Sequence, residues 1–233
     1  MSNSAVLPVR MPKAILFDLD GTLVDSAPDI TAAVNELLAT RKLPPLSLEQ
    51  VKSMVGNGVK KLVERAFAAS GKPLARVELD DANREMAPIY RRHLTRLTRL
   101  MPGAAEAIAQ LHAAGVALGV ATNKPQVATR EILLHFGFFE RMGVIVGGDA
   151  VNHKKPAPDA LLIALDRLGA APSDALMVGD SVTDVIAARA AGMAVALVRG
   201  GYTVDPVERL GADFICDSLL DLPIVLEGLA DAA

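Results

Sequence analysis

Short apolar runs that alternate with helical patterns constrain the fold of this chain more than any other feature. The runs are apolar throughout, whereas a strand with one face in water alternates apolar and polar residues. Such runs predict strands that are buried on both faces of a sheet. Five clear runs occupy residues 14–17, 116–121, 143–146, 175–178 and 194–198, and residues 213–216 form a weaker sixth.

Helical patterns separate most of these runs, and their ends carry the expected signals. Three of the four segments begin with proline, and a glycine follows each of them. They cover residues 102–114, 125–136, 158–168 and 182–191. Strand–helix–strand units of this length use right-handed crossovers, which produce a parallel sheet with helices on both faces. The order therefore predicts an α/β fold with a doubly wound parallel-sheet core.

One long stretch, residues 24–100, interrupts this alternation. It contains no convincing strand, and its apolar residues recur at helical spacing. The last helix in it is predicted to run from Val77 to about Leu97. We therefore predict two domains, a core formed by residues 1–23 and 101–233 and an inserted α-helical cap formed by residues 24–100.

Composition and charge argue against several classes of protein. With 24 Lys+Arg against 27 Asp+Glu the net charge is −3, and only 3% of residues are aromatic, which disfavours a nucleic-acid partner. No apolar run approaches the roughly 18–20 residues of a membrane span, and residues 1–11 lack the apolar stretch of a secretion signal. The single cysteine, Cys216, excludes an internal disulfide. We expect a cytoplasmic protein with no membrane partner, and the sequence leaves monomer or homodimer open.

Two pairs of acidic residues follow predicted strands. Asp18 and Asp20 come directly after the first strand, and Asp180 and Asp184 follow a later one. Open α/β sheets bind ligands at the carboxyl ends of their strands, and carboxylates gathered there repel one another unless a cation compensates. Mg²⁺ is the natural candidate, because it takes a few carboxylates together with water and phosphate oxygens. Taken alone, each pair is more typical of surface loop acids or of a helix N-cap.

Two further strand ends supply a hydroxyl and a cation. Thr122 and Asn123 precede a helix, where a hydroxyl and free backbone N–H groups can hold phosphate. Lys155 precedes Pro156, which can fix the lysine at the sheet edge. Each of these alone is typical of a turn or a surface charge. An acid pair, a hydroxyl, a lysine and a second acid pair at strand ends are together typical of phosphoryl transfer to a carboxylate with Mg²⁺.

The same segments resemble the four motifs of haloacid dehalogenase superfamily phosphatases. The first motif, DxDGT, is matched by residues 18–22, and the second, a Thr or Ser that ends a strand, by Thr122. The third, a Lys before Pro, is matched by Lys155, and the fourth, GDxxxD, by residues 179–184. Order and spacing agree over roughly residues 12–220, and a helical cap after the first motif is a further feature of the family.

This resemblance implies a role for each catalytic residue. Asp18 would attack phosphorus and form an aspartyl-phosphate, and Asp20 would protonate the leaving alkoxide and then activate water. Thr122 and the backbone N–H groups at Asn123 would bind phosphoryl oxygens. Lys155 would neutralise charge on the nucleophile and on the phosphoryl group.

The resemblance also implies a set of metal ligands. Mg²⁺ would be held by the carboxylate of Asp18, the backbone carbonyl of Asp20 and the carboxylate of Asp180. Asp184 would either support the metal through water or orient Lys155, and the sequence does not decide between these roles.

Within the superfamily, the chain is most similar to phosphoglycolate phosphatases. The supporting segments are FDLDGTLVDS at residues 17–26, VGNGV at residues 55–59 and VATNKP at residues 120–125. This likeness implies hydrolysis of 2-phosphoglycolate to glycolate and phosphate, with a small phosphorylated metabolite as the partner.

The cap would select the substrate. Gly56, Asn57 and Gly58 are expected to form a flexible loop with exposed amides. Lys60, Lys61 and Arg65 lie near this loop in the sequence, and one of them could pair with a substrate carboxylate. Taken singly, each of these three residues is more typical of a solvated charge on a helix. The alternative within the enzyme class is a capped phosphatase for a sugar phosphate, an amino-sugar phosphate or pyrophosphate. A receiver-type phospho-acceptor domain uses similar residue types, but it is far shorter and has no helical insert.

Overall fold

A parallel six-stranded sheet forms the centre of the fold. In the computed structural model, which describes residues 11–223 and 226, the strand order is β5-β4-β1-β6-β7-β8 and every neighbouring pair is parallel. The strands are β1 (Ala14–Phe17), β4 (Ala117–Ala121), β5 (Val144–Val146), β6 (Ala175–Gly179), β7 (Ala194–Val198) and β8 (Phe214–Cys216). Each strand overlaps one of the apolar runs, so the predicted α/β core is confirmed.

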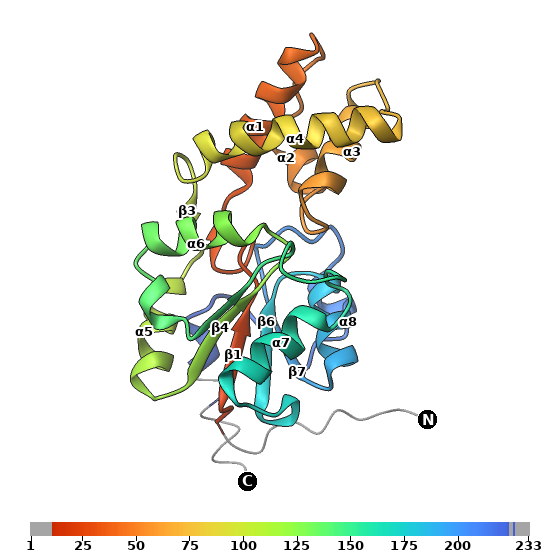
Figure 1. The fold of residues 1–233 in the computed structure, drawn as a ribbon. Coiled ribbons are helices and arrows are strands. Elements are labelled where there is room, and N and C mark those ends of the chain that lie inside the picture. Colours follow the sequence, from red (N-terminus) through yellow and green to blue (C-terminus); the bar gives the residue numbers. More distant parts are fainter. Residues whose placement is uncertain (1–10, 224–225, 227–233) are drawn as a thin grey trace.

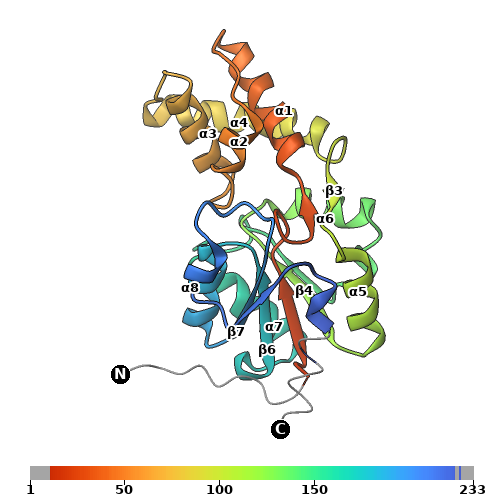
Figure 2. The ribbon, with the colours of Figure 1, turned by 180° about the vertical axis from the view of Figure 1, so that it is seen from behind.

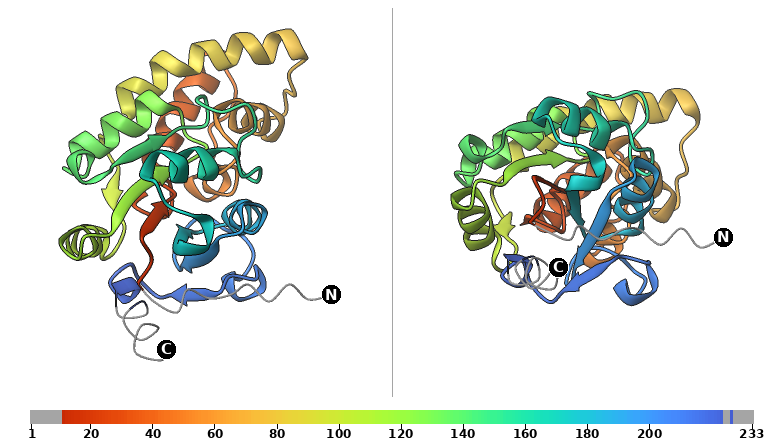
Figure 3. Two further views of the ribbon diagram at one scale, coloured as in Figure 1. Left: turned by 60° about the horizontal axis from the view of Figure 1, so that its bottom comes forward. Right: turned by 90° about the horizontal axis from the view of Figure 1, so that it is seen from below.

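Helices cover both faces of this sheet (Figure 3). On β1, Ile15 and Phe17 belong to one apolar cluster with α5 and α6, whereas Ala14 and Leu16 belong to a second cluster with α7 and α8. The helices are α5 (Ala104–Ala113), α6 (Gln126–His135), α7 (Asp159–Leu168) and α8 (Val182–Ala191), with 3₁₀ turns at Phe139–Arg141, Pro172–Asp174 and Val207–Arg209. No helix in the described part of the chain has the length and apolar character needed to cross a membrane.

Strand β1 lies at the point where the strand order reverses. Its two neighbours are β4 on one side and β6 on the other, so the connections run in opposite directions from it. In open parallel sheets, ligands bind at the carboxyl ends of the strands beside such a switch point. The topology therefore places the segments that follow β1, β4 and β6 around one potential binding site.

Four helices are inserted after β1 and lie beyond the carboxyl edge of the sheet (Figures 1 and 2). The chain leaves the core through β2 (Val24–Asp25) and returns through β3 (Arg99–Leu100), and these two short strands pair antiparallel. The inserted helices are α1 (Ala27–Thr40), α2 (Leu48–Lys52), α3 (Val59–Ala69) and α4 (Arg76–His93). α4 packs against α1 and α3, and their buried apolar residues belong to the same cluster as Ile15 and Phe17 of β1.

The last inserted helix is shorter than predicted, because it ends at His93 rather than near Leu97. The buried carboxylate of Asp29, in α1, accepts hydrogen bonds from the backbone N–H of Leu97 at 2.9 Å and of Thr98 at 2.8 Å. It also accepts one from the Thr98 hydroxyl at 2.7 Å. Because these N–H groups donate to Asp29 in α1, they do not extend the i→i−4 hydrogen bonds of α4. Local sequence patterns cannot predict such a long-range contact.

Candidate active site

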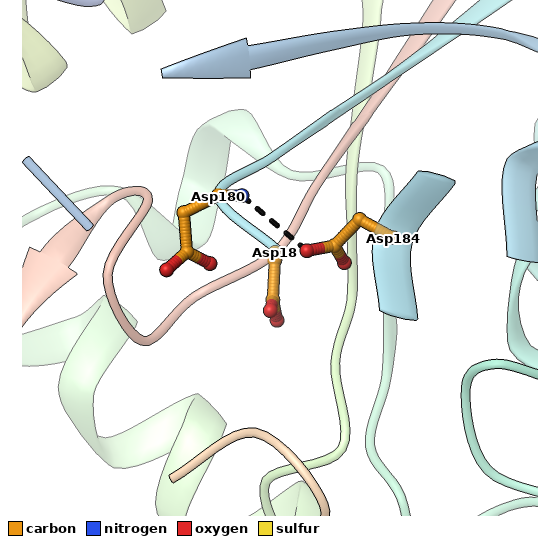
Figure 4. A group of neighbouring side chains, drawn as sticks. All are labelled: Asp18, Asp180 and Asp184. Carbon is orange, nitrogen blue, oxygen red and sulfur yellow. Dashed lines mark hydrogen bonds between the residues drawn. The ribbon is translucent and has the colours of Figure 1, made fainter. Parts of the chain in front are cut away.

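Three buried aspartates meet at the carboxyl edge of the sheet (Figure 4). Asp18 directly follows β1, Asp180 follows β6, and Asp184 lies in the first turn of α8. Each offers one carboxylate oxygen, and the three oxygens lie within 4.8 Å of one another. The structure thus brings together three of the four acids that the sequence assigned to a metal site.

Backbone hydrogen bonds fix this arrangement. The N–H of Asp18 donates to the carbonyl of Val178 at 2.9 Å, which continues the pairing of β1 with β6. One oxygen of Asp184 accepts from the N–H groups of Asp180 at 3.3 Å and Ser181 at 3.1 Å. The Ser181 hydroxyl donates to the same oxygen at 2.7 Å. Asp184 is therefore held by the N–H groups at the start of α8, where a negative charge is favoured.

One lysine faces the three acids. Lys155 Nζ lies 2.7 Å from Oδ1 of Asp184 and 3.1 Å from Oδ1 of Asp18, and its side chain is only 1% exposed. Of the two roles left open for Asp184, direct contact with Lys155 is therefore present in the structure.

The three acids carry more negative charge than Lys155 can neutralise. Burial raises the pKa of Asp18 to about 6, although the nearby Lys155 acts in the opposite direction. Burial and then the charge of Asp184 raise the pKa of Asp180 well above its usual value. A divalent cation would offset this repulsion, and carboxylate oxygens are ligands that such hard cations accept. Asp18, Asp180 and Asp184 therefore form a group that could hold a divalent metal ion.

Two glycines leave room for the carboxylate of Asp180. A Cβ added at Gly21 would lie 2.5 Å from Oδ2 of Asp180, and one at Gly201 would lie 2.4 Å from the same atom. Gly21 also has a φ of +80°, which side chains rarely adopt. Both close approaches require glycine.

Replacing Gly21 with Ala is expected to displace Asp180 and to lower metal affinity by about tenfold or more, as loss of supporting contacts around a metal does. The left-handed backbone should also cost about 1–2 kcal/mol of stability. Gly71→Ala is a matched control, because Gly71 has a φ of +82° but no atom within 4 Å of its added Cβ. Calorimetric titration with Mg²⁺ should separate the two variants, and equal affinities would contradict this account of Gly21.

The carboxylate of Asp20 makes a different set of contacts. Its Oδ1 lies 2.7 Å from Lys124 Nζ and also accepts a hydrogen bond from the Ser26 hydroxyl. Lys124 Nζ in turn donates to the hydroxyl of Tyr90, which comes from α4 of the insert. The side chain of Asp20 is not in the group of three converging acids, and the role of its backbone carbonyl as a metal ligand stays a prediction.

Charge and burial determine the protonation states of Lys124 and Tyr90. Burial alone would lower the pKa of Lys124, but the charge of Asp20 raises it above the usual value. Burial raises the pKa of Tyr90 to about 12. At neutral pH, Lys124 is therefore an ammonium ion and Tyr90 a neutral hydroxyl.

Thr122 and Asn123 lie at the end of β4, beside Asp18. Thr122 Oγ1 accepts a hydrogen bond from the backbone N–H of Lys124 at 3.3 Å, and the nearby hydroxyl partly opposes the rise in the pKa of Asp18 that burial causes. The Asn123 side-chain amide donates at 2.8 Å both to the carbonyl of Lys155 and to the carbonyl of Gly56 in the insert. Asn123 thereby ties the insert to the sheet edge.

A cavity of about 270 Å³ lies between the strand ends and the inserted helices. Asp18, Asp20, Thr122 and Asn123 line it from the sheet side, and all the cap residues predicted to bind substrate line it from the other side: Gly56, Asn57, Gly58 and Arg65. Lys155, which was also predicted to bind substrate, is not among the described residues that line the cavity. The Nζ of Lys155 instead contacts Asp18, and Asp18 does line the cavity.

The cavity wall also contains Tyr202, which links the acidic group to the start of the insert. The Tyr202 N–H donates to Oδ2 of Asp180 at 2.6 Å. Its hydroxyl accepts from the N–H groups of Ser26 at 2.7 Å and Ala27 at 2.9 Å, and it donates to Asp25 at 2.7 Å. Asp180 and the strand that leads into the insert are therefore joined through one residue, by its backbone N–H on one side and its hydroxyl on the other.

Sequence reasoning missed Lys124, Tyr90 and Tyr202. A usable signal existed for Lys124, because it precedes Pro125 at a strand end just as Lys155 precedes Pro156. No comparable local signal marks the chain's two tyrosines, which reach the site only through tertiary packing.

Comparison with known proteins agrees with this geometry. The family model for haloacid dehalogenase-like hydrolases matches residues 15–198. A phosphoglycolate phosphatase from Rhodospirillum rubrum is 43% identical over 91% of this chain and 90% of its own length. A crystal structure described as a predicted phosphoglycolate phosphatase from Haemophilus somnus has a TM-score of 0.87 and 34% identity, over 92% of this chain and 98% of that one.

A relative with a different named substrate is also similar. An N-acetylmuramic acid 6-phosphate phosphatase from Pseudomonas aeruginosa is 38% identical over 92% of this chain and 95% of its own length. The match of the family model to most of the chain and the extensive identity to these relatives lead to one conclusion. The chain belongs to the haloacid dehalogenase-like hydrolase family.

Proposed function

We propose that this protein is a Mg²⁺-dependent phosphomonoester hydrolase that cleaves 2-phosphoglycolate to glycolate and phosphate. The observation that carries the proposal is that Asp18, which lines a small cavity, pairs with Lys155 and lies beside the carboxylates of Asp180 and Asp184. A fourth acid, Asp20, also lines the cavity. A nucleophilic carboxylate and a nearby proton-transfer group are what hydrolysis through an acyl phosphate needs.

The metal would be held by the carboxylates of Asp18 and Asp180, with Asp184 beside them. When bound, the ion neutralises part of the charge that otherwise keeps an anionic nucleophile and an anionic phosphate apart. Asp184 would act mainly by orienting Lys155, since one of its oxygens contacts Lys155 Nζ and the other is bound by N–H groups.

The chain's own residues would carry out two displacement steps. In the first, an oxygen of Asp18 attacks phosphorus, the ester P–O bond breaks, and Asp20 gives a proton to the leaving alkoxide. In the second, water attacks the aspartyl-phosphate, Asp20 takes a proton from that water, and the bond from phosphorus to Asp18 breaks. Thr122 and the N–H groups near Asn123 would bind phosphoryl oxygens, and Lys155 would stabilise charge on Asp18.

The insert would act as a cap domain, with residues 24–100 divided from the core of residues 1–23 and 101–233. The antiparallel pair of β2 and β3 is the connection between the two, and Asn123 and Lys124 of the core contact Gly56 and Tyr90 of the insert. These contacts would shield the reaction from water. A cytoplasmic location and the choice between monomer and homodimer stay predictions.

The cavity favours a small substrate. Its volume of about 270 Å³ lies below the range of roughly 300–1,000 Å³ that is common for drug-sized ligands. 2-Phosphoglycolate consists of one phosphate and one carboxylate joined through a single methylene group, which suits this space.

Phosphate release from a panel of esters tests the proposal. The panel contains 2-phosphoglycolate, hexose phosphates, N-acetylmuramic acid 6-phosphate and pyrophosphate, each with Mg²⁺ and with EDTA. We expect 2-phosphoglycolate to lead in kcat/KM by about tenfold, which corresponds to about 1.4 kcal/mol, and EDTA to stop turnover. A lead by N-acetylmuramic acid 6-phosphate would contradict the proposed substrate but not the phosphatase chemistry.

A further inference from the structure

Lys124 is a buried cation that has no role in the two displacement steps described above. Its side chain is 2% exposed, and its Nζ lies 2.7 Å and 3.1 Å from the two carboxylate oxygens of Asp20. The Nζ also donates to the hydroxyl of Tyr90 and lies 4.8 Å from the centre of the Tyr90 ring. A buried lysine is costly unless it is paired, and the partner of Lys124 is the proton-transfer acid itself.

The cavity contains few cations that could meet a second anionic group on the substrate. Arg65 and Lys124 are the basic residues among the described residues that line it. Arg65 donates to the carbonyl of Met54 at 2.9 Å, within the insert itself. Lys124 instead contacts Asp20, the residue that must reach the ester oxygen.

The short length of the substrate brings its carboxylate close to both Asp20 and Lys124. Proton transfer requires the ester oxygen of 2-phosphoglycolate to lie within hydrogen-bond reach of Asp20. Only one methylene group separates that oxygen from the substrate carboxylate. A group in direct contact with Asp20 is therefore close to the carboxylate as well, and Lys124 is such a group.

We propose that Lys124, positioned by Tyr90 of the insert, binds the carboxylate of the substrate and so selects phosphate esters that carry a second anionic group beside the ester oxygen. This inference rests on the proposed function and assigns its specificity to one core residue. The substrate carboxylate becomes a second partner of Lys124 beside Asp20. The hydrogen bond between them is charge-assisted and therefore stronger than one between neutral groups. Because Tyr90 belongs to α4, the recognition site is complete only while the insert touches the core.

A matched pair of substrates tests this inference. Ethyl phosphate has the skeleton of 2-phosphoglycolate with a methyl group in place of the carboxylate. The wild-type protein should prefer 2-phosphoglycolate in kcat/KM, and Lys124→Met should lower that preference by about 10- to 100-fold. Lys124→Arg keeps the cation and should retain most of the preference, which separates recognition from a general effect on folding or on Asp20.

Two controls complete the design. Lys60→Met removes one positive charge from the exposed surface of the insert, where Lys60 pairs with Asp80, and it should leave the preference unchanged. Tyr90→Phe removes the hydroxyl that contacts Lys124 and should lower the preference by about threefold through looser positioning of the ammonium group.

The outcomes distinguish the two proposals. If the wild-type protein hydrolyses 2-phosphoglycolate no better than ethyl phosphate, the proposed substrate is wrong and so is the recognition by Lys124. If the wild-type protein prefers 2-phosphoglycolate but Lys124→Met lowers both rates equally, only the inference about Lys124 is overturned. Loss of the preference in Arg65→Ala but not in Lys124→Met would likewise overturn it in favour of Arg65.

Discussion

Asp18→Asn should lower kcat by about 10,000-fold or more, because the amide cannot act as the nucleophile on phosphorus. The fold should persist, because Asp18 lies at a strand end and its hydrogen bond to the carbonyl of Val178 is donated by the backbone N–H and not by the side chain. Phosphate release under saturating 2-phosphoglycolate and Mg²⁺ measures the loss. Mass spectrometry of the purified variant is needed to exclude deamidation back to aspartate.

The same variant should be more stable than the wild-type protein when no metal is present. Folding raises the pKa of Asp18 from 3.8 to about 6, so the folded state favours the protonated acid. The stability that this group contributes is therefore complete below pH 3.8 and is lost as the pH rises through about 6. At pH 7.5 in EDTA, Asp18→Asn should raise the free energy of unfolding by about 1–3 kcal/mol.

Urea unfolding at pH 5 and at pH 7.5 checks this sign. The gain from Asp18→Asn should be smaller at pH 5, which lies inside the window from 3.8 to about 6, than at pH 7.5. Added Mg²⁺ should stabilise the wild-type protein more than the variant. Asp166→Asn, at an exposed position on α7, is a suitable control for the loss of one negative charge. If Asp18→Asn is less stable than the wild-type protein at pH 7.5 without metal, the conclusion that excess negative charge destabilises this site is wrong.

Asp180→Asn should raise the Mg²⁺ concentration needed for half-maximal activity by about 100-fold or more. Changes in residues that merely support a metal ligand cost about 10- to 100-fold in affinity, so the loss of a direct ligand should cost at least as much. The amide oxygen can still accept the hydrogen bond from Tyr202, so the loop should keep its conformation. Activity measured over a series of Mg²⁺ concentrations tests the prediction.

Partial recovery at high Mg²⁺ would identify Asp180 as a metal ligand, because excess ion can compensate for a weakened site. Asp166→Asn should again show the wild-type Mg²⁺ dependence. An unchanged Mg²⁺ requirement in Asp180→Asn would show that the metal binds elsewhere.

Local sequence patterns were sufficient for the core of the fold. Each predicted strand and helix of the sheet overlaps an observed element, because buried parallel strands are uniformly apolar and helix ends carry proline and glycine. The convergence of Asp18 with Asp180 also followed from the topology, since parallel strands present their carboxyl ends at one edge.

Contacts between residues far apart in the sequence could not be predicted in the same way. The early end of α4 depends on Asp29, which lies 68 residues before Leu97 in the chain. The contact of Tyr90 with Lys124 depends on how the insert docks on the sheet edge. Neither pairing has a local signature, because each joins residues whose proximity arises only from tertiary packing.

The most direct test of the account is to identify the phosphorylated residue. The wild-type protein would be mixed with 2-phosphoglycolate and Mg²⁺, quenched during turnover and treated with borohydride, which reduces an acyl phosphate to an alcohol. Peptide mass spectrometry should then find the reduced side chain at position 18. Labelling at Asp20 instead, or no labelled residue in a quenched sample that is turning over, would contradict the assignment of Asp18 as the nucleophile.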